Sequence, residues 1–244
     1  MAALGVTFGS STPYAVRRAY LHARMDMEVD AARMDAAAGT IAELLKLAKD
    51  NDDDIGLVIG TSKAAHAMAP SGQTDAAVAR LTAIEPMALR AQDAGALWCV
   101  YSALAGAQLT MGRFEAALES TLKSLRYARD RARQAKVSHV QSLNLLGNVY
   151  MAMTNWDKAL QVIQEALVMA DEAGFSKLKG TLHLNQGAVL GSLGRPAASV
   201  EAYEKALWIG RGAGPVGLQG TARNNIRDSY LISKNYLKAE VFAR

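Results

Sequence analysis

A short turn sequence recurs along the second half of the chain at a nearly constant interval. It appears as Gly112-Arg113-Phe114, Thr154-Asn155-Trp156, Gly194-Arg195-Pro196 and Lys234-Asn235-Tyr236, whose first residues lie 42, 40 and 40 positions apart. A further step of 40 residues toward the N-terminus reaches Gly72-Gln73-Thr74, where a more degenerate copy is expected. A fixed period of this length is typical of repeat proteins, in which each unit packs on its neighbours.

One amphipathic helix is expected before this turn and one after it. In the clearest copy, Leu146, Gly147 and Tyr150 precede the turn, and Ala159, Ile163 and Ala166 follow it. This spacing places apolar groups on one stripe of each helix, and small residues let the two backbones approach closely. The contact positions hold Ala105, Gly147, Gly187 and Arg227 in the first helices and Ala117, Ala159, Ser199 and Ala239 in the second. Arg227 departs most from the pattern and is expected to weaken its copy.

This arrangement resembles the L-G-x-x-Y and A-x-x-x-F pattern of the tetratricopeptide repeat (TPR) family. The resemblance implies an all-α fold, a right-handed superhelix of about five helix-turn-helix repeats plus N-terminal helices. Residues 58–244 would form this solenoid, with copies that start near residues 58, 98, 140, 180 and 220 and a last copy that is incomplete. Since the standard repeat has about 34 residues, the longer period implies longer helices, as in TPR proteins of the kinesin light chain and Pins types.

Residues 1–57 are predicted to form an N-terminal helical region, a degenerate helix pair. Thr12-Pro13 has the form of a helix N-cap followed by proline, and residues 14–49 are rich in Ala, Leu and Met without an interior proline. The acidic segment 51–54 is expected to be a solvated break before the first repeat. It lacks the later glycine and glutamate of an EF-hand loop, so a calcium site is not favoured.

Composition narrows the possible classes of function. The chain has 244 residues, half of them hydrophobic, and a mild formal net charge of +4. Its one cysteine, Cys99, excludes an internal disulfide framework and favours a reducing compartment. The four histidines show no metal-ligand spacing, and neither a long apolar run nor a signal-peptide pattern is present. We therefore expect a cytoplasmic protein with no metal, no cofactor and no membrane association.

Two glycine-rich motifs resemble nucleotide sites but fail on their context. Gly212 to Gly217 fits G-x-G-x-x-G, yet it follows a predicted helix and not a strand. Gly214 lies 40 residues after Gly174, so both are expected in turns between repeats, where glycine provides a left-handed helix cap. Residues 56–63 contain two glycines, but their lysine does not directly follow the second one, as a Walker motif requires. No catalytic set can be placed by spacing, so we predict that the chain is not an enzyme.

The resemblance assigns partner binding to first-helix side chains on the concave surface. An asparagine amide has a donor and an acceptor, so a row of asparagines can hydrogen-bond the backbone of an extended peptide. The alternative is that Asn185 and Asn225 cap or bridge neighbouring helices within the stack. Ser102, Gly106 and Leu109 would form a less polar end of the groove. The predicted contact residues are Gln141, Asn144, Asn148, Met151, Leu184, Asn185, Asn224 and Asp228.

A basic segment begins in one of the predicted second helices. Because second helices of TPR proteins face the convex side, the favoured interpretation is a solvated outer face, and the alternative is a surface for an anionic partner. Nucleic acid is not the favoured partner, because the predicted concave face carries asparagines where a basic surface would be needed. The segment contains Lys123, Arg126, Arg129, Arg131, Arg133 and Lys136.

We therefore predict a protein-protein interaction module that holds a peptide or helical segment of a partner, as the sensory or scaffolding part of a larger protein. The alternative is an oligomerisation or regulatory region of a bacterial signalling enzyme, such as a diguanylate cyclase or histidine kinase. Alanine-rich arrays with this period are similar to the sensory regions of such proteins. The last copy is expected to end without a cap, which would also allow a homo-oligomer through the C-terminal end.

Overall fold

The computed structural model describes residues 12–30, 33–68, 72–128, 133–211 and 217–242. The regular secondary structure within these ranges consists of α-helices alone, in agreement with the predicted fold class. The helices are α1 (Tyr14–Asp30), α2 (Met34–Lys49), α3 (Asp54–Met68), α4 (Thr74–Ala91), α5 (Ala94–Thr110), α6 (Phe114–Tyr127), α7 (Arg133–Ala152), α8 (Trp156–Glu172), α9 (Ser176–Ser192), α10 (Pro196–Gly210), α11 (Leu218–Ile232) and α12 (Tyr236–Val241).

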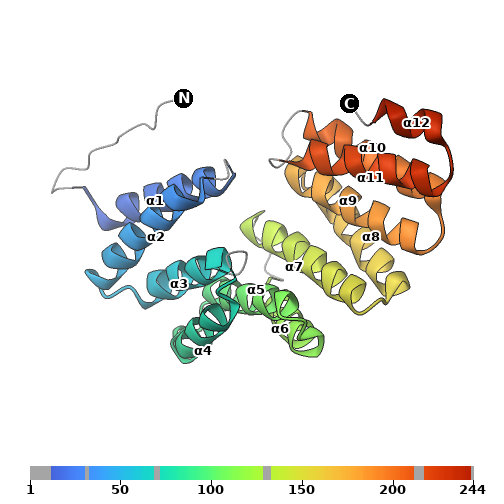
Figure 1. Ribbon diagram of the computed structural model, residues 1–244. Helices are drawn as coiled ribbons and strands as arrows, with labels where there is room; N and C mark the ends of the chain where they lie inside the picture. The colour runs from blue at the N-terminus through green and yellow to red at the C-terminus, as the bar shows by residue number, and fades with distance from the viewer. Residues whose placement is uncertain (1–11, 31–32, 69–71, 129–132, 212–216, 243–244) are drawn as a thin grey trace.

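The helices form consecutive pairs that stack into an open arch (Figure 1). Five pairs run from α3/α4 to α11/α12, after an N-terminal pair of α1 and α2. Each second helix also packs against the first helix of the next pair, and successive first helices from α3 to α11 contact one another. First helices therefore form the inner layer, whereas α4 and α6 lie on the outer side of the arch. The prediction of about five helix pairs after N-terminal helices is confirmed.

The first helices begin two to seven residues before the predicted starts of the copies. α3 begins at Asp54 and α11 at Leu218, against predicted starts near 58 and 220, and α7 begins at Arg133, against 140. The predicted boundary between residues 57 and 58 thus falls inside α3. A division into an N-terminal region and a solenoid stays a prediction.

The recurring turn has the same backbone conformation in the five pairs from α3/α4 to α11/α12. The residue that opens it has a positive φ angle, 77° at Gly72, 69° at Gly112, 56° at Thr154, 71° at Gly194 and 57° at Lys234. The next backbone N–H donates to a carbonyl five residues earlier, as in the 2.8 Å bond from Asn155 to Tyr150. This is the Schellman arrangement that closes a helix. Because Thr154 adopts a left-handed conformation with a Cβ atom, it is strained by about 1 kcal/mol relative to glycine.

Small residues lie where they are predicted, at the contacts between paired helices. A Cβ atom at Gly147 would lie 2.9 Å from Cγ1 of Ile163, and one at Gly187 would lie 2.5 Å from Cε1 of Tyr203. Neither distance leaves room for a side chain in a close-packed interior. The second-helix positions Ala117, Ala159, Ser199 and Ala239 are buried. At the departing position, Arg227 keeps its guanidinium out of the core by pairing with Asp228 at 2.9 Å.

The prediction of a solvated break at residues 51–54 is wrong for Asp53, whose side chain is only 14% exposed. Its carboxylate accepts a 2.8 Å hydrogen bond from the backbone N–H of Gly56 and so caps the start of α3. It also pairs with Arg18 of α1 at 2.8 Å and accepts a hydrogen bond from Tyr14. The sequence does not show that α1 returns to this loop, and that return is what buries the carboxylate.

The two glycine-rich motifs have different outcomes. Residues 56–63 lie inside α3, so they form no phosphate-binding loop. Gly174 follows α8 with a φ of 70°, in agreement with its predicted role in a turn. Residues 212–216, with Gly214, lie outside the described residues, as do Arg129 and Arg131 of the basic segment.

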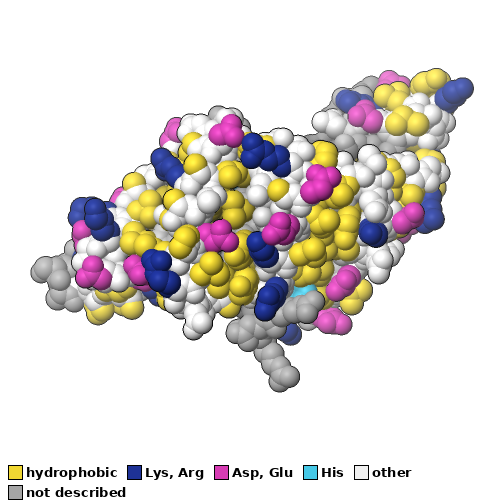
Figure 2. All heavy atoms as spheres, turned by 90° about the horizontal axis from the view of Figure 1, so that it is seen from below, with side chains coloured by type: hydrophobic (Ala, Val, Ile, Leu, Met, Phe, Trp, Pro, Cys, Tyr) yellow, Lys and Arg dark blue, Asp and Glu magenta, His cyan; other side chains and the backbone are white. Residues whose placement is uncertain are grey.

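The outer side of the arch carries a mixture of charges. Figure 2 shows basic and acidic side chains interspersed with hydrophobic ones on this side. Lys123 of α6 pairs with Glu119 at 2.8 Å, and both side chains are largely exposed. This agrees with the outer-face interpretation for the part of the basic segment that the structure describes. None of the described helices is long and apolar enough to cross a membrane.

Candidate functional site

All eight predicted contact residues lie on first helices of the inner layer. Gln141, Asn144, Asn148 and Met151 belong to α7, Leu184 and Asn185 to α9, and Asn224 and Asp228 to α11. Gln141, Asn224 and Asp228 are exposed, and the other five are half-buried. The structure brings three of them into direct contact.

Those three are asparagines, and they bridge two neighbouring repeats. The Nδ2 atom of Asn185 donates to Oδ1 of Asn144 at 2.9 Å and to Oδ1 of Asn148 at 2.8 Å. We call these three residues the amide cluster. The alternative interpretation, that Asn185 bridges neighbouring helices, is therefore correct.

Bridging does not exhaust the hydrogen-bonding capacity of the amide cluster. The Nδ2 groups of Asn144 and Asn148 and the Oδ1 atom of Asn185 have no partner among the described residues. Since each primary amide offers two donors and one acceptor, the cluster presents free donors beside a free acceptor. The bridge also holds these groups in fixed orientations, so they need little ordering before they bind.

One repeat further along, between α9 and α11, the same positions are filled differently. Asn225 stands 40 residues after Asn185, but its neighbours are Leu184 and Ala188, where α7 has Asn144 and Asn148. Leu184 packs against the apolar cluster of α10 and α11. The side chain of Asn225 has no hydrogen-bond partner among the described residues. The amide bridge is therefore not repeated at this interface.

An open cleft of about 400 Å³ takes its place. Gly191 stands where α7 has Met151, so no side chain fills the space between α9 and α11. Sequence reasoning identified Asp228 but missed the cleft, although the loss of a large side chain at Gly191 was a visible signal. The lining residues are Ala188, Gly191, Ser192, Pro196, Ser199, Tyr203, Asn225, Asp228, Ser229 and Ile232.

The opposite end of the predicted groove offers fewer free polar groups. Ser102 donates to the carbonyl of Trp98 in its own helix at 2.7 Å. Trp98 in turn donates through Nε1 to Oγ of Ser142 at 3.0 Å, which ties α5 to α7. Burial raises the pKa of the nearby Cys99 thiol to about 11, so this thiol is protonated at neutral pH and is a poor nucleophile.

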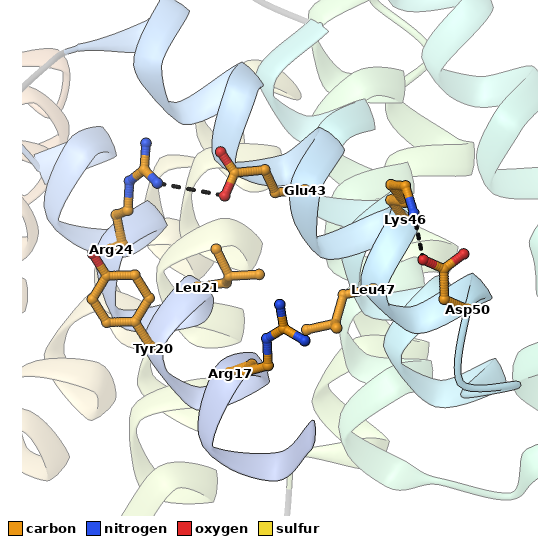
Figure 3. Close-up of a pocket in the computed structure, with 8 residues that line it drawn as sticks. All are labelled: Arg17, Tyr20, Leu21, Arg24, Glu43, Lys46, Leu47 and Asp50. Carbon is orange, nitrogen blue, oxygen red and sulfur yellow. Dashed lines mark hydrogen bonds and ion pairs between the residues drawn. The ribbon is translucent and has the colours of Figure 1, made fainter. Parts of the chain in front are cut away.

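A second pocket, of about 290 Å³, lies between α1 and α2 (Figure 3). Four of its five charged side chains form two ion pairs: Arg24 contacts Glu43 at 3.5 Å, and Lys46 contacts Asp50 at 2.5 Å. Arg17 is the fifth charged residue of the lining, so the formal charge of the pocket is small. Elsewhere in the described ranges, no group of three or more His, Cys, Asp or Glu side chains could hold a metal ion.

Comparison with protein families identifies the repeat. Residues 139–209 match the model of the tetratricopeptide repeat family. This segment of the chain consists of tetratricopeptide repeats. The matched TPR segment begins in α7 and ends in α10, so it includes the whole amide cluster. No curated protein sequence matches the chain.

Several solved structures share the TPR superhelix. The chain is similar to BtubC (BKLC) from P. vanneervenii, with a TM-score of 0.68 and 18% identity over 95% of this chain and 89% of that one. A Rap protein complexed with Competence and Sporulation Factor gives a TM-score of 0.70 and 13% identity, over 96% and 75% of the two chains. These similarities confirm the predicted right-handed TPR fold.

A third similar structure is much longer than this chain. It is a Signal Transduction ATPase with Numerous Domains (STAND) protein with a tetratricopeptide repeat sensor, from Pyrococcus horikoshii. The TM-score is 0.70 and the identity 22%, over 94% of this chain but only 36% of that protein. The present chain therefore corresponds in fold to about a third of the STAND protein.

Proposed function

We propose that this chain is a non-enzymatic binding module that holds an extended segment of a partner protein along α7, α9 and α11. The observation that carries the proposal is the amide cluster, with free amide donors on Asn144 and Asn148 and a free acceptor on Asn185. An extended peptide backbone offers alternating carbonyls and N–H groups, which suit this set whatever the side chains are. The bound Rap protein, complexed with a factor, is consistent with such a use of the fold.

A second candidate is a regulatory or oligomerisation region of a larger bacterial signalling protein. It is favoured by the exposed apolar side chains of α12, where Leu237 is 82% and Val241 72% exposed. The equivalent positions of α8 hold Asp157 and Gln161, which are polar. Neighbouring repeats leave those two side chains exposed, so stacking alone does not explain why this surface is apolar at α12. The TPR sensor of the STAND protein is a parallel for a sensory role.

The leading proposal is tested by separating the bridging and binding roles of Asn148. Asn148→Asp keeps an oxygen that accepts from Asn185 but removes the free N–H donors. Gln161→Glu, on the exposed outer face of α8, introduces the same change of amide to carboxylate away from the groove and serves as the control. We would compare partners that co-purify with the wild type and with each variant from the source cell, after circular dichroism has confirmed folding.

We expect that a partner that co-purifies with the wild type is lost from Asn148→Asp and retained by Gln161→Glu. Identical partners with all three proteins would contradict binding through the amide cluster. A partner lost instead from a Leu237→Asp/Val241→Lys variant would favour the second candidate.

A further inference from the structure

The cleft between α9 and α11 exists because two neighbouring repeats differ in side-chain volume. One repeat earlier, the corresponding positions hold Met151 of α7 and Trp156 of α8, which pack against the apolar cluster of α7, α8 and α9. At the cleft these positions hold Gly191 of α9 and Pro196 of α10. The space of about 400 Å³ beside Gly191 and Pro196 follows from these smaller side chains.

The walls of the cleft are mostly apolar. Tyr203, which is buried, and Ala188, which is half-buried, belong to its lining, together with the exposed side chains of Pro196 and Ile232. Such walls suit an aliphatic chain, because burying it removes apolar surface from water.

The polar groups of the cleft include a carboxylate and several other hydrogen-bond acceptors beside the donors of its hydroxyl and amide groups. Asp228 is the charged residue in the lining, and no Lys, Arg or His contributes to it. Arg227, outside the lining, donates twice to Oδ1 of Asp228, at 3.0 and 2.9 Å, and no hydrogen bond to Oδ2 is made among the described residues. The side chain of Asn225 adds an amide oxygen without a partner. The hydroxyl of Ser229 already donates to the carbonyl of Asn225 at 2.8 Å and can still accept.

From this geometry we infer that the cleft is a specificity pocket for a lysine or arginine side chain of the bound segment. The aliphatic stem lies against the apolar walls, and the cationic head reaches the free oxygen of Asp228 and the amide of Asn225. The inference rests on the proposed function, because the peptide backbone must be held beside the cleft. The amide cluster does lie beside it, since Asn185 and Ala188 are three residues apart on α9 and neighbour each other on the helix surface.

The test begins with a phage-displayed library of random dodecapeptides, selected against the full chain. A selected peptide is then synthesised with lysine and with norleucine at the enriched position, since norleucine keeps the stem and lacks the charge. Fluorescence anisotropy gives the Kd of both peptides for the wild type, Asp228→Asn and Gly191→Leu. Glu201→Gln, an exposed carboxylate of α10 paired with Lys205 at 2.7 Å, is the control for loss of a negative charge.

We expect lysine or arginine at one fixed position and a preference of about fivefold for lysine over norleucine, as for an exposed ion pair. The preference disappears in Asp228→Asn and persists in Glu201→Gln. Gly191→Leu fills the cleft and weakens the binding of both peptides at least about tenfold, as expected when a buried side chain loses its pocket. A Cβ atom at Gly191 meets only the Ser199 side chain, with Oγ at 3.4 Å and Cβ at 4.0 Å, so this variant is expected to fold, and a thermal melt checks that it does.

Two failures can be told apart. Suppose that the peptides lose binding to Asn148→Asp but show no preference for a basic residue, or keep full affinity for Gly191→Leu. This result would refute the specificity pocket and leave the proposal of peptide binding along α7, α9 and α11 intact. Peptides that bind Asn148→Asp as well as the wild type, or a library that yields no binder, would refute both peptide binding through the amide cluster and the specificity pocket.

Discussion

The interface between α7 and α9 and the interface between α9 and α11 are built from the same repeat, yet they differ in what they leave open. In the first, Asn185 donates to two asparagines and Met151 packs against the core. In the second, Asn225 has no side-chain partner among the described residues, and Gly191 leaves a cleft. The role of an asparagine in this array is thus set by the residues one repeat before it.

The largest effect is expected from the contact of Gly187 with Tyr203, a residue that lines the cleft. Gly187→Val places a Cβ atom 2.5 Å from the ring of Tyr203, so overpacking should destabilise the chain by about 3 kcal/mol. Urea unfolding followed by circular dichroism measures this. Gly191→Ala, one turn further along α9, is the control and should be neutral or slightly stabilising, because helical glycine is unfavourable. Equal destabilisation by both variants would show that the cleft is not open at Gly191.

A smaller difference in stability is expected between variants of Asn185 and Asn225. Asn185→Ala removes two hydrogen bonds and should lower the free energy of unfolding by about 2 kcal/mol. Asn225→Ala removes none and should change it by less than about 0.5 kcal/mol. The same urea unfolding experiment tests both variants, and similar losses from the two would refute the contrast between the interfaces.

Acidification should destabilise the N-terminal pair of α1 and α2 more than the region of α7 and α9. The reason is that the amide cluster does not titrate, whereas the N-terminal pair contains Glu28. Burial alone would raise the pKa of Glu28, but hydrogen bonds from Thr40 at 2.6 Å and Arg24 at 2.9 Å outweigh it and hold the pKa below its ordinary 4.5. This stabilisation is complete above pH 4.5 and is lost as the pH falls through the lowered value.

Hydrogen exchange from pH 6 down to about pH 3 measures that loss region by region. We expect α1 and α2 to lose protection before α7 and α9, with an effect of about 1.5 kcal/mol, the contribution of a hydrogen bond to a charged group. Glu28→Gln should remove the difference in pH dependence. Simultaneous loss of protection in both regions of the wild type would contradict the prediction.

The smallest effect concerns the turns that follow α7 and α9. Thr154 and Gly194 have φ angles of 56° and 71°, so both are left-handed, but only Thr154 carries a Cβ atom. Thr154→Gly should raise the free energy of unfolding by about 0.5–1 kcal/mol, since the relief of strain exceeds the added entropy of the unfolded chain. A shift of the melting temperature checks it, and Gly194→Thr should have the opposite sign. A destabilised Thr154→Gly would mean that the threonine side chain contributes contacts of its own.

Much of the fold could be predicted because it depends on local pattern. The turns at Gly112, Thr154 and Gly194 were located by their period, and the small residues at Gly147 and Gly187 by their spacing. The predicted contact residues also share the inner layer, because equivalent positions of a repeat fall on the same helix face. Whether a partner contacts them stays a prediction.

Contacts between distant segments could not be predicted in this way. Asp53 is an acidic residue in an acidic run, and only the return of α1 with Arg18 makes it a buried cap. The cleft depends on the absence of a side chain at Gly191 and on how far α11 lies from α9, which no period reveals. The partner chemistry that we propose for it therefore comes from the structure.

By itself, the sequence determined the repeat, its period, its turns and the residues on its inner face, since these follow from helix geometry and from which residues tolerate a left-handed turn. Only the tertiary structure decided that Asn185 bridges two repeats while Asn225 is left beside an open cleft. The physical reason is that a hydrogen bond or a cavity belongs to two helices at once, and its existence depends on side-chain volume and distance across their interface.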